Sequence, residues 1–234
     1  MRRFAPVFFA LLFILPLPVG AGTYAEITKP TNARYGPGTT YKVAKVLRTG
    51  SVVEIAETIK KKDRTWYKIK QDAGLRYPER VAGAWYVAAD LVRVRTAYKA
   101  ESEPFSFAKN GKRIIVDISA QKLYAMDGDK LFMSASVSTG NKTTPTPKGT
   151  FSIFRKTPSR YMQGPLPGIS KQYFDLPGVP WTMYFTEQGA AIHGAYWHES
   201  FGATHSNGCV NLPVAKARQL YTWADVGTTV VVRQ

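Results

Sequence analysis

Cysteine and histidine are scarce in this 234-residue sequence, which holds one cysteine and three histidines. A single cysteine excludes an internal disulfide, so its thiol is paired between molecules, buried and inert, or reactive. The four side chains are not scattered, because all of them lie within residues 193–209. The gathering of every imidazole beside the only thiol favours a reactive thiol; the cluster consists of His193, His198, His205 and Cys209.

Acidic side chains are also few, since 16 Asp and Glu stand against 32 Lys and Arg, and the formal net charge is +16. Such a charge suits an acidic polymer as a partner, although solubility alone is an alternative reason for it. The excess is greatest in residues 22–99, where 16 basic side chains face 7 acidic ones. For an exported protein the acidic partner would be a cell-wall polymer or an anionic lipid, and we expect no nucleic acid.

Long apolar runs are absent after residue 21. The one such run, FAPVFFALLFILPLPVG at residues 4–20, follows Arg2 and Arg3 and contains three prolines. A basic start, a short apolar stretch and small residues after it are typical of a cleavable secretory signal. We therefore expect a signal peptide at residues 1–21 and an exported protein in the periplasm, the cell wall or outside the cell. The alternative is an uncleaved membrane anchor.

Residues 22–95 alternate between short runs rich in β-branched and aromatic residues and turns rich in Gly and Pro. The runs predict strands of a small barrel at residues 41–47, 51–59, 65–70 and 84–94. The segments TNARYGPGTTYKVAKVLRTGSVVEI and WYVAADLV resemble a bacterial SH3-like domain, a family whose members often bind cell-wall peptides. A spacer that only packs on the rest of the protein is the alternative.

A polar segment at residues 96–112, which contains Pro104, predicts a linker. Residues 113–234 follow as a second, β-rich unit. Its strands are expected at residues 112–119, 121–126, 130–139, 149–154 and 228–233, with a hairpin turn at DGD, residues 127–129.

Two segments of this second unit depart from the pattern of short strands. Residues 157–180 are rich in Gly and Pro and too long for a passive connection, so we expect a lid or a substrate groove there. Residues 212–225 carry apolar side chains at helical spacing after Pro213 and predict the only clear helix. The chain is therefore expected to be mainly β, with an SH3-like barrel followed by a β-sandwich that has one main helix.

The reactive cluster has features that suit nucleophilic chemistry. A free thiol has a pKa of about 8.5 and is mostly protonated at neutral pH, but an imidazole can take its proton and then stabilise the thiolate. His193 ends an apolar strand and precedes a glycine, where backbone groups can orient the ring. Cys209 follows Gly208, which permits a tight turn with N–H groups beside the sulfur. This combination predicts acyl transfer through a thioester.

Two other interpretations of the cluster stay open at this point. The three histidines and the cysteine are ligand types that suit zinc, although their spacing differs from the common zinc-finger patterns. Alternatively, Cys209 is an inert core residue and the histidines near it are incidental.

Several segments, in order along the chain, resemble the L,D-transpeptidase catalytic domain over about residues 113–232. They are VSTGNKTTPTPKGTFSI, FDLPGVPWTMYFT and IHGAYWHESFGATHSNGCVNLP. The resemblance implies that Cys209 is the nucleophile, that His193 donates and accepts protons, and that the Gly194 carbonyl orients His193. It implies attack after the third residue of a peptidoglycan tetrapeptide stem, release of D-alanine, and cross-linking by an amine. It also implies no metal or cofactor, and carbapenem-type β-lactams as inhibitors.

The sequence departs from the family at one position. The family usually has Ser-His-Gly-Cys, whereas this chain has Ser206, Asn207, Gly208 and Cys209. With His193 as the base, Asn207 still offers a hydrogen-bond donor and activity survives. With an essential histidine at this position instead, the protein would be an inactive wall-binding module. An L,D-carboxypeptidase, in which water resolves the thioester, is the rival within enzymes.

The remaining candidates surround the reactive pair. For the oxyanion hole we expect the N–H groups of Gly208 and Cys209, together with Asn207. For substrate contact we expect Tyr184, Trp197, His205, Ser206 and Asn211. His198 either lines the groove or lies on the surface, and Asp175 and Glu199 either meet amino groups of a stem peptide or are solvated. The third stem residue, diaminopimelate or lysine, and the acyl acceptor stay undetermined.

Overall fold

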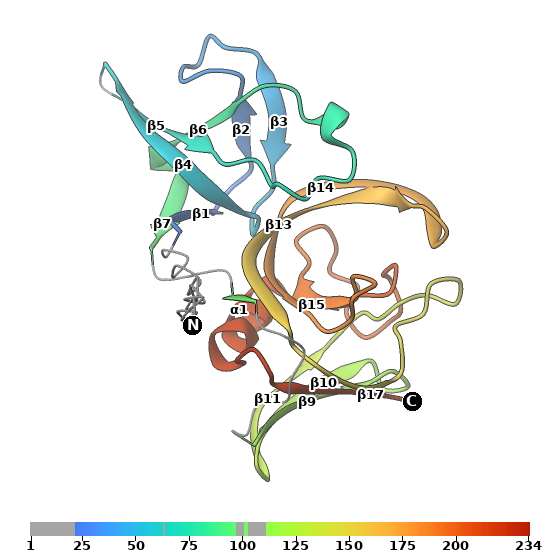
Figure 1. Ribbon diagram of the computed structural model, residues 1–234. Coiled ribbons are helices and arrows are strands. Elements are labelled where there is room, and N and C mark those ends of the chain that lie inside the picture. Colours follow the sequence, from blue (N-terminus) through green and yellow to red (C-terminus); the bar gives the residue numbers. More distant parts are fainter. Residues whose placement is uncertain (1–21, 63, 97–100, 103–110) are drawn as a thin grey trace, which may run out of the picture.

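A computed structural model describes residues 22–62, 64–96, 101–102 and 111–234 of the chain (Figure 1). The expected signal peptide at residues 1–21 lies outside the described residues, and so does most of the expected linker at residues 96–112. Within the described residues no helix is both long and apolar enough to cross a membrane. The fold is mainly β, with three sheets and one α-helix among the described residues.

The first sheet, called here the N-terminal sheet, has seven strands in the order β3-β2-β6-β5-β4-β1-β7. Each of the four expected runs contains a strand, but residues 84–94 form two strands separated by a short 3-10 turn, η2. The sheet surrounds its own apolar core, which includes Ile27, Leu47 and Trp85. Its elements are β1 (Tyr24–Ile27), β2 (Thr31–Arg34), β3 (Val43–Leu47), β4 (Val52–Lys61), β5 (Arg64–Ile69), η1 (Pro78–Arg80), β6 (Trp85–Ala88), η2 (Ala89–Leu91) and β7 (Val92–Arg95).

The second part of the chain forms two five-stranded sheets. One has the order β11-β10-β9-β17-β12 and the other β16-β15-β14-β13-β8. The DGD turn joins β10 to β11, as predicted. The elements are β8 (Glu101–Ser102), β9 (Lys112–Asp117), β10 (Lys122–Asp127), β11 (Lys130–Ser136), β12 (Gly149–Ser152), β13 (Arg155–Leu166), β14 (Ser170–Tyr184), β15 (Ala191–Gly194), β16 (Val210–Leu212), α1 (Val214–Trp223) and β17 (Thr229–Arg233).

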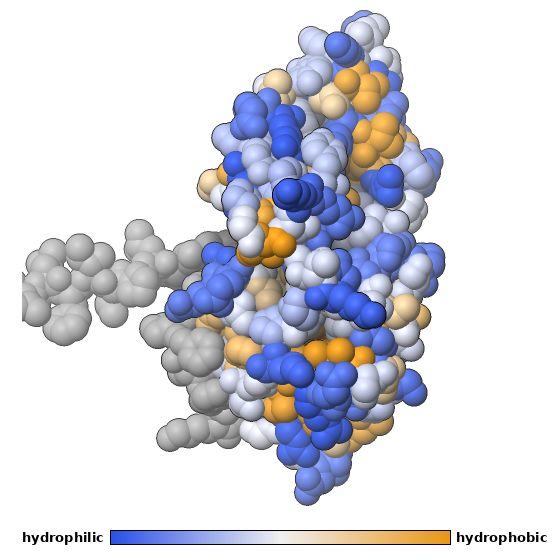
Figure 2. Space-filling view, turned by 90° about the vertical axis from the view of Figure 1, so that its right-hand side faces the viewer, coloured by the Kyte–Doolittle hydropathy of each residue, from blue (hydrophilic) through white to orange (hydrophobic). Residues whose placement is uncertain are grey.

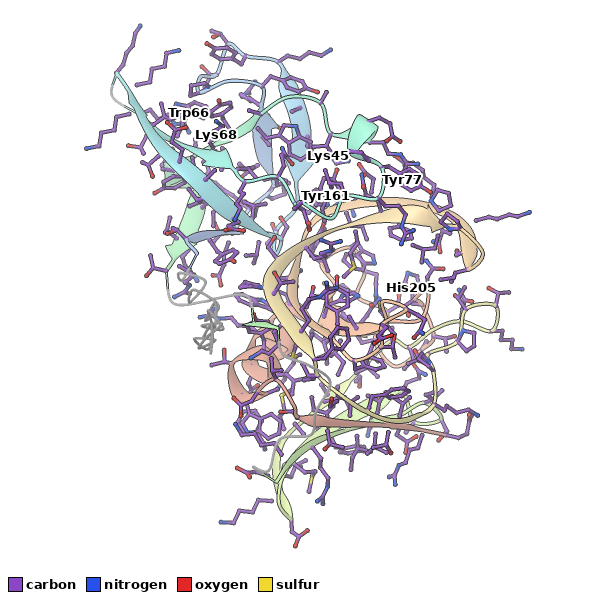
Figure 3. The ribbon with its side chains drawn as sticks, in the orientation of Figure 1. Lys45, Trp66, Lys68, Tyr77, Tyr161 and His205 are labelled. Carbon is purple, nitrogen blue, oxygen red and sulfur yellow. The ribbon has the colours of Figure 1, made fainter. Side chains whose placement is uncertain are left out.

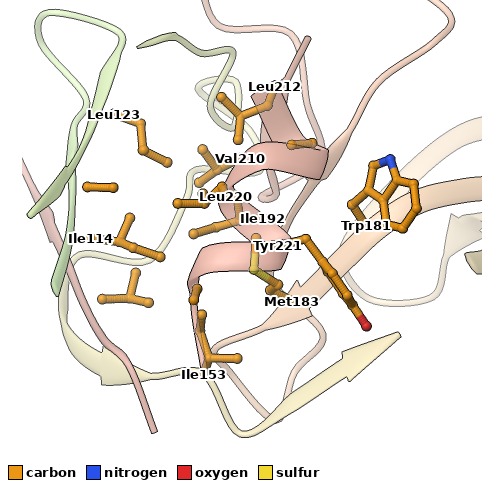
Figure 4. Close-up of a cluster of buried hydrophobic side chains, with 14 of the residues drawn as sticks. Ile114, Leu123, Ile153, Trp181, Met183, Ile192, Val210, Leu212, Leu220 and Tyr221 are labelled. Atoms are coloured by element: carbon orange, nitrogen blue, oxygen red, sulfur yellow. The ribbon is translucent and has the colours of Figure 1, made fainter. Parts of the chain in front are cut away.

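The core of this second part lies between its sheets and α1 (Figure 4). Side chains of β9 and β10, such as Ile114 and Leu123, meet side chains of β15, β16 and α1 there. Gly194 allows the close approach of α1, because a Cβ at this position would lie 2.9 Å from Pro180 Cγ and 3.3 Å from Ala217 Cβ. The helix therefore buttresses the strand that carries His193.

Residues 157–180, for which a lid or a substrate groove was expected, form regular strands over most of their length, and their role at the site stays a prediction. They belong to a long antiparallel hairpin of β13 and β14, which arches between the N-terminal sheet and the rest of the second part (Figure 1). β8 pairs only with Arg155 and Lys156, and β15 pairs only with Met183 and Tyr184. Within the part of the chain that the structure describes, the outer hairpin is thus a two-stranded ribbon with unpaired outer edges, where proline costs no ladder hydrogen bond.

Candidate active site

The neighbouring strands β15 and β16 position the reactive residues. They run parallel, with His193 opposite Asn211 and Ile192 opposite Val210. Because side chains alternate along a strand, Ile192 and Val210 share one face while His193 and Asn211 share the other. The first pair enters the apolar core. The face that carries His193 and Asn211 is therefore separated from the apolar core, and its polar side chains can take part in a reaction.

The turn before β16 presents Cys209. Gly208 has a φ of +104°, a conformation that favours glycine. The carbonyl of Cys209 accepts hydrogen bonds from Ser206 Oγ at 2.5 Å and from Thr146 Oγ1 at 3.4 Å. In the described part of the chain no acceptor pairs with the N–H groups of Gly208 and Cys209. These two donors are therefore available to an oxygen that carries developing negative charge.

The thiol of Cys209 lies against the start of β15. Its sulfur is 3.9 Å from the carbonyl oxygen of Gly189, and the N–H of Ala191 donates to it. Burial of the sulfur raises the pKa of Cys209 to about 11, and the smaller effect of the Ala191 N–H lowers it. The resting thiol is therefore protonated at neutral pH.

His193 lies on the same face, two residues further along β15 than Ala191. It is only 2% exposed. Its Nδ1 lies 3.1 Å from the carbonyl oxygen of Gly194. Since a carbonyl only accepts, Nδ1 carries the proton and Nε2 is free to accept one. The expected contact with Gly194 is therefore present.

Burial lowers the pKa of His193 to about 4, although the Gly194 carbonyl raises it, and His198 lowers it further. The pair at rest is consequently a thiol and a neutral imidazole. The physical reason is desolvation, which disfavours the charged form of both groups.

His198, which the sequence left open, lies beside Asn211 and so next to His193 in the strand register. Its Nε2 is 3.0 Å from Asn211 Nδ2, and its Nδ1 accepts from the N–H of Ser200 at 3.2 Å. Its ring centroid is 4.4 Å from that of His205, an exposed residue. Burial, with a contribution from His205, lowers the pKa of His198 to about 4. His198 therefore contacts both Asn211 and His205.

The residues expected to contact substrate fall into two groups. Trp197 is half-buried with its ring 5.7 Å from that of His193, and Tyr184 lies opposite Ala191 in the β14–β15 ladder. Burial raises the pKa of Tyr184, and the charges of Arg160 and Arg155 oppose this effect. Ser206 and Asn211 are buried and bond to the protein itself. Direct contact of any of these residues with a substrate stays a prediction.

Asn207 stands where the family usually has histidine. Both the nitrogen and the oxygen of its side-chain amide form hydrogen bonds. Its Nδ2 donates to Gln172 Oε1 on β14 at 2.9 Å. Its Oδ1 accepts from Thr144 Oγ1 at 3.4 Å. The side chain thus links the nucleophile turn to the β13–β14 hairpin and to the loop at residues 139–146, and the sequence did not predict either contact.

That loop lies in the segment VSTGNKTTPTPKGTFSI, which carried a family resemblance but no predicted role. Asn141 Oδ1 accepts from the N–H groups of Thr143 and Thr144, each at 2.9 Å. The N–H of Gly140 donates to Thr146 Oγ1 at 2.8 Å. The density of Asn, Thr, Gly and Pro in GNKTTPTP was the available signal, since such side chains cap local turns. The loop braces the turn that carries Cys209.

Two further expectations are resolved by contacts. Asp175, considered as a partner for amino groups of a stem peptide, is bound by Lys45 of its own chain at 2.5 Å, whereas Glu199 is exposed. Within the described residues, no three His, Cys, Asp or Glu side chains converge as a metal site would require. The His and Cys cluster is therefore not arranged as one zinc site.

A β-rich fold that holds one thiol and an oriented, neutral imidazole on neighbouring parallel segments, with two N–H groups available in the thiol's turn, has the groups that acyl transfer through cysteine uses. Residues 111–232 match the YkuD family, the L,D-transpeptidase catalytic domain. The match spans more than half of the chain, and the protein belongs to this family. No curated protein matches the chain significantly.

Solved structures share the fold. An L,D-transpeptidase from Mycobacterium smegmatis is 20% identical with a TM-score of 0.50, and the alignment covers 78% of this chain and 99% of that one. L,D-transpeptidase 3 from Mycobacterium tuberculosis, solved with a faropenem-derived adduct, is 15% identical with a TM-score of 0.50, covering 77% and 98%. The catalytic domain from an E. faecium L,D-transpeptidase is 25% identical with a TM-score of 0.47, covering 53% and 98%.

Proposed function

We propose that the protein is a peptidoglycan L,D-transpeptidase that works outside the cytoplasm, in cell-wall organisation and the maintenance of cell shape. The observation that carries the proposal is the pairing of β15 with β16, which puts His193 and the residue just before β16, Cys209, on neighbouring chain segments, with Nδ1 of His193 tied to Gly194. The family acts on peptidoglycan, which gives the substrate class. No step of the proposed reaction uses a metal or an organic cofactor.

In the first half-reaction, the sulfur of Cys209 attacks the carbonyl carbon of the third residue of a tetrapeptide stem. Nε2 of His193 takes the thiol proton as the bond forms. The carbonyl oxygen becomes an oxyanion and accepts from the N–H groups of Gly208 and Cys209. When the tetrahedral intermediate collapses, His193 returns the proton to the leaving amine of D-alanine, and a thioester remains.

In the second half-reaction, an amine of another stem attacks the thioester. His193 accepts a proton from that amine, and the Cys209 sulfur leaves and takes the proton back. The products are a cross-linked peptide and the resting neutral pair. This cycle fits the raised pKa of Cys209 and the lowered pKa of His193, because neither group needs to be charged between turnovers.

The parts of the chain are proposed to divide this work. Residues 1–21 would direct export, residues 22–95 would form an SH3-like barrel that binds the wall, residues 96–112 a linker, and residues 113–234 the catalytic domain. The surface in Figure 2 is mostly hydrophilic, with hydrophobic residues confined to separate patches. Together with the net charge of +16 this favours an acidic cell-wall polymer as a partner.

The wall-binding part of the proposal is tested without deleting the N-terminal sheet. Lys60, Lys61 and Lys62 form a basic cluster at the end of the β4–β5 hairpin. Their replacement by Gln is expected to lower the amount of protein that sediments with purified cell wall, and more so at low salt. Equal sedimentation of this variant and the wild type would remove the cluster from the wall-binding site.

Intact-mass spectrometry with a carbapenem tests the reactive pair. The wild type is expected to gain the mass of one carbapenem molecule, because the strained amide acylates Cys209 without a second substrate. Cys209→Ala is expected to gain none. An unmodified but folded wild type would overturn the assignment of a working acyl-transfer site and favour an inactive binding module.

Purified tetrapeptide muropeptides then separate the possible outcomes. Cross-linked dimers with release of D-alanine are the result expected of a transpeptidase. Tripeptides alone would show that water resolves the thioester and that the protein is an L,D-carboxypeptidase.

A further inference from the structure

The β13–β14 hairpin lies between the N-terminal sheet and the site. Figure 3 shows Lys45, Tyr161 and Tyr77 on the side of the arch that faces the N-terminal sheet, and His205 on the other side. The hairpin therefore has contacts of two kinds, with a different part of the chain on each side.

On the first side, the carboxylate of Asp175 accepts hydrogen bonds from three side chains, one on β3 and two on β13. It accepts from Lys45 Nζ at 2.5 Å, from Tyr161 Oη at 3.0 Å and from Gln163 Nε2 at 3.2 Å. Tyr161 also packs in the apolar core of the N-terminal sheet, with its ring 6.1 Å from that of Trp85. Only 10% of the Asp175 side chain is exposed. This contact joins β14 to the N-terminal sheet.

A second anchor lies nearer the tip of the hairpin. Tyr77 donates its N–H to Gln163 Oε1 at 2.9 Å and its hydroxyl to the Pro165 carbonyl at 2.8 Å. Arg80 donates to the Gly164 carbonyl at 2.6 Å. Arg160 and Asp72 form an ion pair further back. The loop between β5 and β6 thus grips β13 by several polar contacts.

On the other side, one contact reaches the nucleophile turn. Gln172, three residues before Asp175 on the same strand, accepts from Asn207 Nδ2 at 2.9 Å. Asn207 is two residues before Cys209 and lies in a turn whose conformation Gly208 fixes. β14 therefore carries both the anchor to the N-terminal sheet and the contact to the reactive turn.

We infer that Asn207 is a positioning residue, which together with Gln172 ties the anchored hairpin to the turn that presents Cys209. The inference rests on the proposed function, because the step that it positions is acylation of Cys209. An amide cannot act as a general acid or base at neutral pH, so Asn207 handles no proton. The contact is partly exposed, so its loss changes geometry at the turn without unfolding the chain.

Carboxylates introduced on either side of this hydrogen bond, one at a time and then together, test the contact. In Asn207→Asp the side chain of Gln172 can turn and donate its NH₂, and in Gln172→Glu the amide of Asn207 still donates. Each single variant therefore keeps a hydrogen bond. The double variant faces two carboxylates with no donor between them. Asn207→Asp combined with Lys171→Gln is the control, since it changes the net charge equally without opposing carboxylates.

The acylation rate constant at saturating carbapenem is the first measurement. We expect the double variant to lose about two- to tenfold more than the product of the single effects, while the control shows no such excess. The pH profile of acylation should keep its shape in Asn207→Ala, and the thermal midpoint should be unchanged. Amide hydrogen exchange of residues 166–174 is the second measurement, and it should accelerate only when the contact is broken.

Three outcomes decide the inference. Independent effects of the two single changes, with unchanged exchange in the hairpin, would overturn it. Faster exchange with an unaltered acylation rate would show a structural contact and overturn the positioning role. A wild type that is never acylated would instead overturn the proposed function, and hydrogen exchange would still report whether Asn207 and Gln172 are joined.

Discussion

The strands that carry the reactive pair and the hairpin beside them are built in opposite ways. Every residue of β15 and β16 is buried. The hairpin tip instead exposes Ile169 by 51% and Tyr173 by 66%, and among the described residues the outer part of the hairpin pairs with no third strand. Packing fixes the first region, whereas side-chain contacts to distant segments fix the second. The difference indicates that close packing holds the strands of the reactive pair rigidly. The hairpin beside the site can instead be adjusted through its polar contacts.

The largest effect is expected in the buried strands, where His193 lies. His193→Ala removes the group that takes the thiol proton and should lower the acylation rate of Cys209 by about 10²- to 10⁴-fold. His205→Ala removes an exposed imidazole and should lower the acylation rate of Cys209 by no more than about threefold. Time-resolved intact-mass spectrometry with a carbapenem measures both. The reverse ranking would mean that His205, and not His193, serves as the base.

The pH dependence of stability sharpens the same contrast. The pKa of His193 is lowered from 6.5 to about 4 in the folded protein. The unfolded chain therefore binds an extra proton between these values, and stability is lost as the pH falls from 6.5 to 4. A shift of this size corresponds to about 3 kcal/mol in the free energy of unfolding. Urea unfolding at a series of pH values checks it.

His193→Asn is the matched variant for this pH series, because its amide can still donate to the Gly194 carbonyl. It should flatten the loss of stability between pH 6.5 and 4. A smaller slope should remain, because His198 is shifted in the same direction. An unaltered slope in the variant would show that His193 is not the source of the dependence.

The smallest effect is expected at the hairpin. Asp175→Ala should lower the free energy of unfolding by about 1–2 kcal/mol, because it leaves Tyr161 and Gln163 without their shared acceptor. Asp90→Ala, which removes the exposed ion pair with Arg64, is the control and should cost less than about 1 kcal/mol. Equal losses in chemical denaturation would erase the distinction between an anchoring carboxylate and a surface one.

The sequence predicted most of the elements that depend on local pattern. Strands expected at residues 112–119 and 121–126 are confirmed as β9 and β10, and helical spacing predicted α1. The glycines after His193 and before Cys209 indicated where backbone groups would surround the pair, and the contact between His193 and Gly194 was expected. In each case the cause lies within a few residues of the effect, so it is visible along the chain.

The parts that escaped prediction depend on contacts between distant segments. Gly and Pro in residues 157–180 are usually signs of a loop, and only the absence of neighbouring strands makes them compatible with the hairpin. Lys45 lies 130 positions before Asp175, and no local pattern joins them. The charge states of Cys209 and His193 follow from burial, which depends on the completed fold.

The neutral resting pair has a consequence for chemical durability. With a pKa of about 11, only about one Cys209 in ten thousand is thiolate at pH 7. Peroxides, disulfides and other small electrophiles react with the thiolate and hardly at all with the thiol. We therefore expect Cys209 to be oxidised slowly while the pair is at rest. It is expected to react when a bound acyl donor brings its carbonyl to the sulfur and an imidazole takes the thiol proton.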